Sequence, residues 1–401
     1  MELASLLELA GKTGKQSWRP MLEYVALLHK KSIHPPQGCF QHEWEEIGPG
    51  YCYGPAFGHW DIVHAVLDYV TADPAHGKLQ LHNLLSLQLP DGLIPCVVWM
   101  RQGWDNTVMK MLCHPPVWHF AANDLAPDDE DGGFIESCLS SLLRQIAWFE
   151  SKRKAEPFGF YFKDILTHEW ESGVDEGIRF LDVKTGPLPC IDATAQVHAL
   201  YERAAEWSKR LGRKSDEWEE KAGRLKSFIQ EKLFSEETGF FHDAWSVDDP
   251  SRRCFSFEGM WPVVTGAASA RQAMRVIDEC LLNPACLFSK HPIRTVAVSD
   301  PRFEMRMWRG PAWNSMTYWA ARGCRRYGRD DAAGRLLEMA LDASAEQFER
   351  TGTIWEFYHS EGGRPEDVSR KPASEFNMPC RDYLGHNPLI AMAELYDSTR
   401  G

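Results

Sequence analysis

The chain contains no long hydrophobic run. Although 44% of its 401 residues are hydrophobic, no window approaches the roughly 18 consecutive apolar residues that a membrane-spanning helix needs. The first residues, MELASLLELAGKTGKQSW, also lack the basic region, the long apolar run and the small-residue cleavage site of a secretory signal. We therefore expect a cytoplasmic protein that does not act at a membrane.

Cysteine motifs are absent as well. The eleven cysteines are scattered along the chain, are odd in number and include no C-x-x-C pair. This arrangement fits neither a zinc site nor a disulfide framework in a chain of this length. We expect reduced thiols that lie mostly in the core.

Positive charge is scarce relative to negative charge. The chain has 44 lysines and arginines against 57 aspartates and glutamates, a net charge of −13. Such a protein repels nucleic acid, and no basic stripe interleaved with aromatic residues offsets the repulsion. The sequence instead favours a small-molecule partner and is compatible with a homo-oligomer.

Familiar cofactor and metal motifs are also missing. Residues 11–13 (GKT) end like a phosphate-binding loop, but Leu6 stands where that loop requires glycine. His59 and His64 are five residues apart, which places them on different faces of a helix. The acidic run 128–131 lacks the spacing of a calcium loop, so we expect a solvated loop in which Asp131 caps the next helix. The sequence thus predicts no metal and no cofactor.

Tryptophan, by contrast, is abundant. Many of the sixteen tryptophans stand beside Gly, Asp, Glu or Arg rather than within apolar runs. Indole faces pack well on the C–H faces of sugar rings, and the indole N–H can bond to hydroxyl groups. A tryptophan-rich core would explain the composition equally well, so composition alone leaves both interpretations open.

Helical periodicity dominates wherever a hydrophobic pattern is clear. Long alternating runs typical of strands are missing, and about ten to twelve amphipathic helices are indicated. The clearest predicted helices cover roughly 18–32, 59–71, 74–88, 132–153, 196–212, 217–233, 269–282, 312–327, 331–349 and 386–397.

The helices recur as pairs every 50–70 residues without a sharp sequence repeat. This spacing favours a closed ring of helical hairpins over a solenoid, whose repeats are shorter. No linker or low-complexity tract divides the chain, so we expect a single domain over residues 1–401. Loops rich in Gly, Pro, aromatic and acidic residues, such as 48–61 (GPGYCYGPAFGHWD), would surround a pocket at one end of the ring.

Three segments combine carboxylates or a guanidinium with aromatic residues and glycine. In residues 171–175 (ESGVD), two carboxylates flank a glycine turn, an environment that can raise the pKa of an acid, although helix-capping acids would look the same. In residues 355–358 (WEFY), a carboxylate stands among aromatic residues, and in residues 308–313 (WRGPAW) an arginine stands between two tryptophans. Together these segments offer the two carboxyl groups that glycoside cleavage needs.

These segments also resemble those of a known family. Residues 60–61 (WD), 88–95 (QLPDGLIP), 115–116 (PP), 171–175, 308–313 and 355–358 are similar, in the same order, to motifs of glycoside hydrolase family 63, its mannosylglycerate and glucosylglycerate hydrolases and, more distantly, the trehalases. The resemblance extends over about residues 50–397. It implies an all-α fold, an (α/α)6 barrel, and an exo-acting glycosidase that inverts the anomeric centre without a cofactor.

The resemblance also implies roles for individual residues. It assigns the general acid to Asp175 and the general base, which activates water, to Glu356, with Glu375 as a weaker rival for the base. Glu171 and Arg179 correspond to residues that support the acid. The residues that we expect to contact the sugar, or to support those contacts, are Trp60, Asp61, His114, Glu171, Arg179, Trp308, Arg309, Gly310, Trp313 and Tyr358.

The sequence departs from the family pattern at two positions near the expected sugar. His114 stands where relatives commonly have Gln, Glu176 stands where they commonly have Asn, and the tail at 380–387 matches no pattern that we expect. The substrate can therefore differ from those of the named enzymes. Arg309, and less clearly Arg101 and Arg179, are candidate contacts for an anionic group on the substrate.

Two other functions fit parts of the sequence. A sugar epimerase or isomerase on a similar barrel would use paired histidines, for which His59, His64, His114 and His168 are candidates. A carbohydrate-binding protein without catalysis would keep the aromatic residues but need no acid–base pair. Incubation with a panel of disaccharides separates the three functions, because only a glycosidase releases a monosaccharide.

Overall fold

The computed structural model describes residues 1–101, 109–127, 132–167, 170–181, 183 and 186–401, and most of its regular structure is helical. The helices in these ranges are α1 (Leu3–Lys12), α2 (Arg19–Ser32), α3 (His59–Leu67), α4 (Pro74–Ser86), α5 (Trp118–Leu125), α6 (Gly133–Lys152), α7 (Asp164–Thr167), α8 (Ile191–Arg210), α9 (Asp216–Lys232), α10 (Trp261–Thr265), α11 (Ala270–Val276), α12 (Asn314–Arg326), α13 (Asp330–Thr351) and α14 (Leu389–Ser398).

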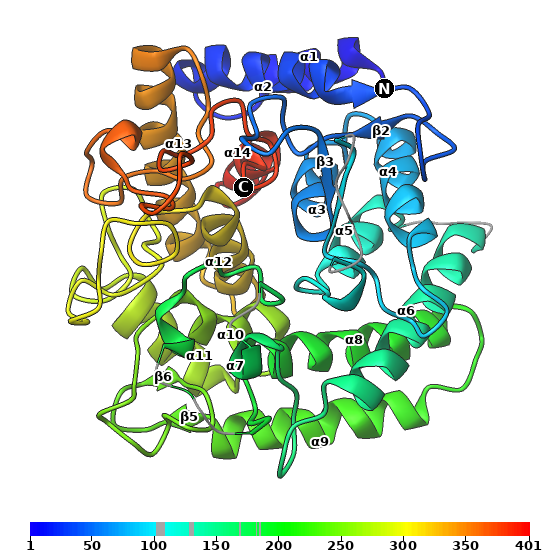
Figure 1. Cartoon of the computed structure of the whole chain (residues 1–401), viewed down its shortest axis with the longest axis vertical. Coiled ribbons are helices and arrows are strands. Elements are labelled where there is room, and N and C mark those ends of the chain that lie inside the picture. The colour runs from blue at the N-terminus through cyan, green and yellow to red at the C-terminus, as the bar shows by residue number, and fades with distance from the viewer. Residues whose placement is uncertain (102–108, 128–131, 168–169, 182, 184–185) are drawn as a thin grey trace.

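The helices form two rings. Figure 1 shows α3, α5, α8, α10, α12 and α14 around the centre, with α2, α4, α6, α9, α11 and α13 outside them. Consecutive helices pair across the rings, as α3 with α4, α8 with α9 and α12 with α13. Within the inner ring, α10 packs against both α8 and α12. The predicted all-α barrel of helical hairpins is therefore observed.

Burial explains which helices are inside. Every residue of α3 and α10 is buried, including the polar residues His59, Asp61 and His64 of α3. In α9, by contrast, only Ala222, Leu225 and Ile229 are buried, and their spacing of three and four residues places them on one face. An outer helix thus needs one apolar stripe, whereas an inner helix packs on nearly all sides.

The strands are short and peripheral. Three antiparallel pairs occur in the described ranges: β1 (Ile33–His34) with β2 (Trp44–Glu45), β3 (Ala56–Gly58) with β4 (Val97–Trp99), and β5 (Phe234–Ser235) with β6 (Phe240–Phe241). The pairing of β3 with β4 matters most for the site, because β3 leads directly into α3 and β4 belongs to the neighbouring loop. This pairing fixes the position at which α3 begins.

The periodic segments of the sequence identify most of the helices. Each of the ten predicted ranges overlaps a helix, and the range 269–282 contains α11 followed by a π-helical turn, Ile277–Leu281. Helices α1, α5, α7 and α10 were not predicted. Helix α5 has the sequence WHFAANDL and α10 has WPVVT, and neither offers a polar stripe from which a helical period can be recognised. Asp131, the expected cap of α6, lies outside the described residues.

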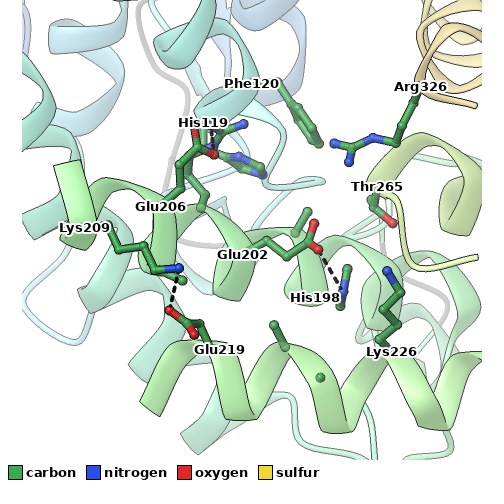
Figure 2. Close-up of a pocket in the computed structure, with 15 residues that line it drawn as sticks. His119, Phe120, His198, Glu202, Glu206, Lys209, Glu219, Lys226, Thr265 and Arg326 are labelled. Atoms are coloured by element: carbon green, nitrogen blue, oxygen red, sulfur yellow. Dashed lines mark hydrogen bonds and ion pairs between the residues drawn. The ribbon is translucent and has the colours of Figure 1, made fainter. Parts of the chain in front are cut away.

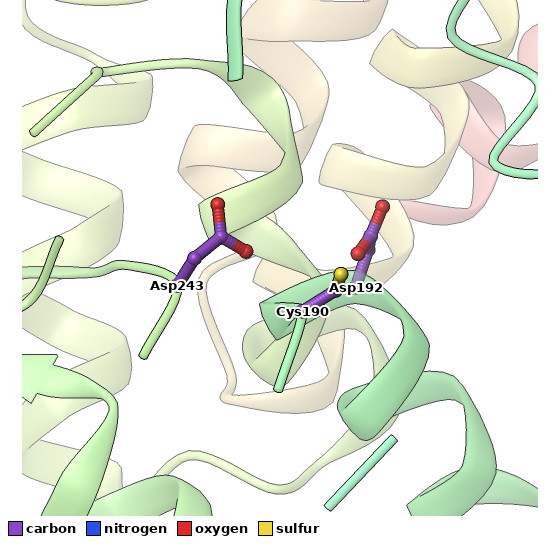
Figure 3. A group of neighbouring side chains, drawn as sticks. All are labelled: Cys190, Asp192 and Asp243. Atoms are coloured by element: carbon purple, nitrogen blue, oxygen red, sulfur yellow. The ribbon is translucent and has the colours of Figure 1, made fainter. Parts of the chain in front are cut away.

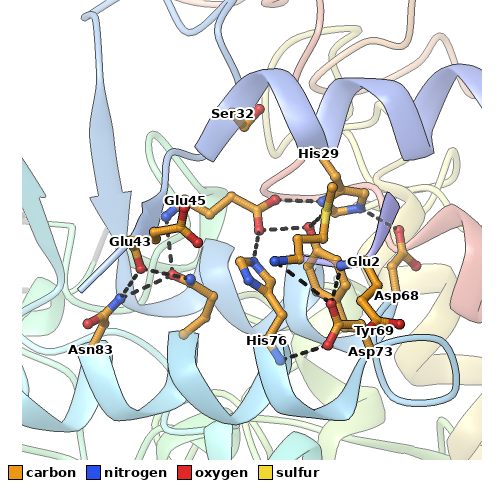
Figure 4. Close-up of polar contacts among 12 residues, drawn as sticks. Glu2, His29, Ser32, Glu43, Glu45, Asp68, Tyr69, Asp73, His76 and Asn83 are labelled. Carbon is orange, nitrogen blue, oxygen red and sulfur yellow. Dashed lines mark hydrogen bonds and ion pairs between the residues drawn. The ribbon is translucent and has the colours of Figure 1, made fainter. Parts of the chain in front are cut away.

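A buried polar network ties α2 to the first strands and to α3 and α4 (Figure 4). Glu45 in β2 accepts hydrogen bonds from His29 at 2.6 Å, Tyr69 at 2.9 Å and His76 at 3.3 Å. The second ring nitrogen of His29 lies 3.1 Å from Asp68. Burial acts against both charges, yet the mutual attraction raises the pKa of His29 to about 9 and lowers that of Glu45 to about 2. The network therefore contains a buried ion pair at neutral pH.

Two sequence-based expectations about the surface and the thiols can be compared with the structure. In the described part of the chain, no helix combines the length and apolar character needed to cross a membrane. All eleven cysteines are free thiols, and nine of them are buried. The prediction that the cysteines lie mostly in the core is confirmed.

Candidate active site

A small cavity lies at the N-terminal end of α3. Its volume is about 240 Å³, below that of cavities that hold drug-sized ligands, so it suits a single sugar unit or a similarly small group. Aromatic side chains dominate its wall, and the charged groups are two carboxylates and one ammonium. The lining residues are Ile47, Tyr51, Tyr53, Asp61, Cys96, Val97, Trp99, His114, Trp170, Asp175 and Lys371.

Asp175 forms one wall of this cavity and is paired with a lysine. Lys371 Nζ donates a hydrogen bond to Asp175 Oδ2 at 2.9 Å, and both side chains keep slightly more than a fifth of their surface exposed. Burial acts to lower the pKa of Lys371, but the charge of Asp175 and the hydrogen bond to it raise that pKa above its usual value. The cavity therefore presents an ionised ammonium group beside the expected general acid.

The loop that carries Asp175 is held from both sides. Behind it, Arg153 donates two hydrogen bonds of 2.6 Å to the fully buried carboxylate of Glu171. Gly173 has φ +72°, and a Cβ there would lie only 2.4 Å from the Trp60 ring, so the loop can pack on this indole only with glycine at that position. After Asp175, Arg309 Nε donates to the carbonyl oxygen of Glu176 at 2.7 Å. These contacts restrain the ESGVD turn and thereby hold the Asp175 carboxyl group in a defined position.

Glu356 lies behind the cavity rather than on its wall. Its side chain is 2% exposed. Arg370 donates two hydrogen bonds to its carboxylate, from Nε to Oε2 at 2.7 Å and from Nη2 to Oε1 at 3.1 Å. The backbone N–H of Cys380 also donates to Oε2 at 3.1 Å. Burial opposes the charge on Arg370, but Glu356 keeps the pKa of Arg370 well above its usual range. The pair is therefore a buried bidentate contact between a guanidinium and a carboxyl group.

Asp61 connects the two carboxylates electrostatically. It lies in the first turn of α3, lines the cavity, and accepts a hydrogen bond from Tyr383 Oη at 2.6 Å. Burial raises the pKa of Asp61 to about 7, the hydrogen bond from Tyr383 opposes the rise, and the charges of Glu356 and Asp175 add to it. All three carboxyl groups therefore belong to one electrostatic site.

Three indoles form a buried stack beside this site. Trp308 and Trp313 are parallel with ring centroids 3.8 Å apart, and Trp60 stacks on the other face of Trp308 at 5.7 Å. His386, which precedes α14, packs edge-on against Trp60 at 4.9 Å and against Trp313 at 4.6 Å. The stack brings together the N-terminal ends of α3, α12 and α14. The rings are at most 2% exposed, so in this structure they form the core behind the cavity and do not line it.

The other residues expected from the sequence divide between the cavity and its supports. His114 lines the cavity, and burial lowers its pKa to about 4, although the charge of Asp175 opposes this shift. Arg179 is buried away from Asp175 and pairs with Asp192 at 2.9 Å and with Asp243 at 3.2 Å. Tyr358 stacks on His291 in the core, with ring centroids 4.6 Å apart.

Two further expected positions also serve as supports. Gly310 donates its N–H to Thr295 Oγ1 at 3.0 Å, and a Cβ there would lie 2.6 Å from the carbonyl oxygen of Glu304. Arg309 donates its Nε–H to the Glu176 carbonyl group and does not line the cavity. Arg101 and Glu375, the candidates for an anion contact and for a rival base, are both exposed.

Several cavity residues were not singled out from the sequence. Tyr51 and Tyr53 belong to the glycine- and aromatic-rich loop 48–61 that was expected to border the pocket, but nothing distinguished the individual side chains. Trp99 and Trp170 were two tryptophans among sixteen. Lys371 follows the WEFY segment by more than ten residues and carries no local signal, since only the folded chain brings it to Asp175.

One cluster has the composition of a metal site. Cys190, Asp192 and Asp243 each place a possible ligand atom within 4.8 Å of the others (Figure 3). The guanidinium of Arg179 already neutralises this cluster through both aspartates, and Glu258 lies 3.4 Å from the same group. Because a cation would compete with a buried arginine, we interpret the cluster as an ion-pair network that holds the segment after Asp175.

Of the candidate histidines of an epimerase that the structure describes, only His114 lines the cavity. Both ring nitrogens of His64 are occupied in the core, Nδ1 with the Gly385 carbonyl group at 2.7 Å and Nε2 with Trp319 Nε1 at 3.0 Å. His59 is fully buried, and burial lowers its pKa to about 3. His168 lies outside the described residues. This geometry gives no support to the histidine-based alternative.

Comparisons with known proteins agree with the sequence resemblance. The profile of the mannosylglycerate hydrolase MGH1-like glycoside hydrolase domain matches residues 55–377. The chain is 25% identical to mannosylglycerate hydrolase MGH1 of Selaginella moellendorffii over 81% of this chain and 76% of that protein.

Solved structures show the same fold. The GH63 mannosylglycerate hydrolase of Thermus thermophilus, in complex with Tris and D-glycerate, superimposes with a TM-score of 0.71 at 19% identity, over 93% of this chain and 98% of that one. Neutral trehalase Nth1 of Saccharomyces cerevisiae gives a TM-score of 0.64 at 14% identity, over 94% and 80% of the two chains. The predicted α/α-barrel class and the predicted glycosidase activity are confirmed: the chain belongs to the mannosylglycerate hydrolase MGH1-like family of glycoside hydrolases, an inverting family.

Proposed function

We propose that this glycosidase removes a terminal hexose from a small α-glycoside with an acidic aglycone, with Asp175 as the general acid and Glu356 as the general base. Residues 1–401 would act as one catalytic domain without a cofactor. The observation that carries the proposal is the contact of Asp175 with Lys371 in the wall of a small cavity. In the proposed reaction Asp175 would transfer the proton, and the ammonium group of Lys371 would lie beside the leaving group.

Asp175 suits the role of acid because it is the carboxyl group of the ESGVD turn that reaches the cavity. Both oxygens of Glu171, the other carboxylate of the turn, are occupied by Arg153 and by backbone N–H groups, including that of Cys113 at 3.3 Å. A carboxylate enclosed in this way cannot deliver a proton to a substrate. Asp175 is partly exposed and its backbone is held in place, and a general acid needs both access to the substrate and a defined position.

Glu356 suits the role of base because Arg370 holds its carboxylate in place with two hydrogen bonds. Oε2 accepts hydrogen bonds from Arg370 and from the Cys380 N–H, whereas Oε1 accepts one hydrogen bond from Arg370 among the described residues. A carboxylate oxygen has two lone-pair sites, so Oε1 keeps one for a water molecule. In an inverting site the two carboxyl groups stand about 6.5–9.5 Å apart, with the water between the base and the sugar. We expect this separation between Asp175 and Glu356.

The preference for an acidic aglycone rests on Lys371. A carboxylate on the leaving group would compete with Asp175 for the ammonium group and would free the Asp175 carboxyl group to face the glycosidic oxygen. Two relatives are named mannosylglycerate hydrolases, and the Thermus thermophilus enzyme has been crystallised with D-glycerate. The small cavity favours attack at a chain end over attack within a polymer.

A substrate panel tests this proposal. Mannosylglycerate, glucosylglycerate, trehalose, kojibiose and nigerose are compared with soluble starch under one set of conditions. We expect the highest kcat/KM for a glycosylglycerate, and proton NMR of a fresh reaction should show the β-anomer of the released sugar first. Fastest hydrolysis of starch into mixed oligosaccharides, or early appearance of the α-anomer, would contradict the proposal.

The cellular setting is a further part of the proposal. The free thiols agree with a reducing compartment such as the cytoplasm. Measurement of the free thiol content in protein isolated from its native cells tests this assignment, and we expect eleven titratable thiols after unfolding.

A further inference from the structure

A second and larger cavity lies at the other end of the inner helices. Its volume is about 520 Å³, and it is bordered by α8 and α9 and by the last residues of α10 and α12 (Figure 2). It shares no lining residue with the cavity beside Asp175. Helix α12 separates the two, since it begins after Trp313 and ends at Arg326, a span of about 20 Å. We call this the distal cavity.

Most of the charges around the distal cavity are already paired. Arg203 Nη1 lies 2.6 Å from Glu206, and Lys209 Nζ lies 2.8 Å from Glu219. Two cations remain: neither Lys226 nor Arg326 makes a hydrogen bond or ion pair with any residue that the structure describes. Arg326 is exposed and Lys226 half-buried, and Figure 2 shows both head groups directed into the cavity near Thr265.

The remaining carboxylate in the cavity, Glu202, does not neutralise these cations. It lies 3.6 Å from His198 Nε2, too far for a hydrogen bond. Burial raises the pKa of Glu202 above its usual value, while the charges of Arg326 and Lys226 act in the opposite direction. The lining of the distal cavity holds four basic and three acidic side chains, a slight excess of positive charge on a chain whose net charge is −13.

Two buried histidines add polar atoms without partners. His119 is 1% exposed and His198 is fully buried, both line the cavity, and neither makes a hydrogen bond through its ring nitrogens within the described ranges. Burial, together with the charges of Arg326 and neighbouring cations, lowers the pKa of both rings, so both are neutral at neutral pH. A neutral imidazole offers one donor and one acceptor. Buried polar atoms of this kind normally have partners, which points to a ligand or to water.

We propose that the distal cavity binds a small polyhydroxylated oxyanion, such as a sugar phosphate or a sugar acid. Arg326 and Lys226 would bind the oxyanion, because guanidinium and ammonium groups are the usual partners of phosphate and carboxylate. His119, His198 and Glu202 would bind hydroxyl groups, and Phe120 would contact an apolar ring face. A volume of about 520 Å³ accommodates a phosphorylated hexose with water.

Isothermal titration calorimetry with glucose 6-phosphate, inorganic phosphate and glucose tests the proposal on the full-length protein. We expect saturable binding of glucose 6-phosphate at one site and weaker binding of inorganic phosphate, which lacks the hydroxyl contacts. The substitutions Lys226→Gln and Arg326→Gln should each weaken the binding of glucose 6-phosphate about tenfold, since each removes one charged hydrogen-bond donor.

Arg224→Gln is the matched control. Arg224 lies in α9 two residues before Lys226, but it lies on a different face, over the Phe158 ring. The control removes the same charge from the same helix and should leave the affinity unchanged. The proposal is wrong if glucose 6-phosphate does not bind saturably, or if Lys226→Gln and Arg326→Gln bind it as the wild type does. If inorganic phosphate binds as tightly as glucose 6-phosphate, the sugar hydroxyl groups do not contribute to binding, and that part of the proposal is wrong.

Discussion

Lys371 and Asp175 are 196 positions apart in the chain, yet their side chains share a hydrogen bond of 2.9 Å. The contact joins the ESGVD turn to the loop that follows Glu356, so the expected acid and a cation form one wall. The aromatic ring of Tyr53 lies beside the ammonium group, 5.7 Å from Nζ, and helps to hold it there. In the proposed function, this ammonium group would bind the carboxylate of an acidic aglycone.

Lys371→Met should reduce the discrimination between acidic and neutral substrates. The substitution keeps an unbranched side chain of similar length but removes the charge that would bind an aglycone carboxylate. We expect KM for a glycosylglycerate to rise about tenfold or more, because a charged hydrogen bond contributes about 1.5–3 kcal/mol. Steady-state kinetics on glucosylglycerate and on a neutral disaccharide such as kojibiose measure the change.

The neutral substrate serves as the internal control for this variant. If Lys371 acts only on Asp175, kinetic constants for both substrates should change in parallel. Parallel changes would show that the lysine does not recognise the aglycone.

Asp175→Asn and Glu356→Gln should both abolish most turnover but should differ in stability. Each substitution removes proton-transfer capacity while keeping the shape of the side chain, so we expect kcat to fall by orders of magnitude. Asp175 is partly exposed, and its loss should leave thermal unfolding nearly unchanged. Glu356→Gln leaves the buried guanidinium of Arg370 without a charged partner, which costs about 3–5 kcal/mol.

Calorimetry and single-turnover kinetics on the two variants check this contrast. Arg370→Gln in the Glu356→Gln background should restore part of the lost stability but none of the activity. Turnover near that of the wild type in either single variant would contradict the role assigned to that residue.

The sequence pointed to both candidate catalytic segments because they carry local signals. A carboxylate next to a glycine turn, or among aromatic residues, can be recognised within five positions, and both residues lie in one electrostatic site around Asp61. Lys371 and Arg370, which hold those carboxylates, could not be recognised, because only the closure of the barrel brings them there. The tryptophans of the WRGPAW segment also could not be placed, since a run of aromatic residues has the same composition whether it lines a pocket or fills the core behind it.

The fold was predictable to the extent that its helices are amphipathic. Helix α9 has one apolar stripe and was recognised at nearly its observed bounds. The inner helix α5 was missed, because a helix that packs on almost every side has no polar face to give it a period. Periodicity therefore reveals the outer ring more clearly than the inner one.

Asp61→Asn should stabilise the free protein at alkaline pH while it impairs catalysis. The pKa of Asp61 rises from 3.8 to about 7 on folding, mainly through burial, so ionisation of Asp61 progressively destabilises the wild type as the pH rises from about 4 to 7. Asparagine has no such cost and can still accept the hydrogen bond from Tyr383. We expect the Tm of the variant to exceed that of the wild type by up to about 5 °C at pH 8 and by less at pH 5.

Differential scanning calorimetry between pH 5 and 8 measures this difference. A gap in Tm that does not change with pH would show that Asp61 ionises in the folded state as easily as in the unfolded chain.

The last prediction concerns the buried network of His29 and Glu45. The pKa of His29 is raised from 6.5 to about 9, so its stabilising contribution is complete below about pH 6.5 and is lost as the pH rises through 9. The pKa of Glu45 is lowered from 4.5 to about 2, so its contribution is complete above about pH 4.5 and is lost as the pH falls toward 2. The network therefore contributes most between about pH 4.5 and 6.5.

His29→Gln removes the cation from this network and leaves Glu45 buried beside Tyr69 and His76. Loss of one partner of a buried ion pair costs about 3–5 kcal/mol, so we expect a clear fall in Tm at pH 6. Above pH 9 the wild type has itself lost the charge on His29, and the two proteins should approach each other in stability.

Lys31→Gln, an exposed position in the last turn of the same helix α2, is the control and should change Tm by less than about 1 °C. Thermal unfolding at pH 6 and at pH 9.5 decides the matter: if His29→Gln lowers Tm equally at both values, the histidine stabilises the fold by packing and not through its charge.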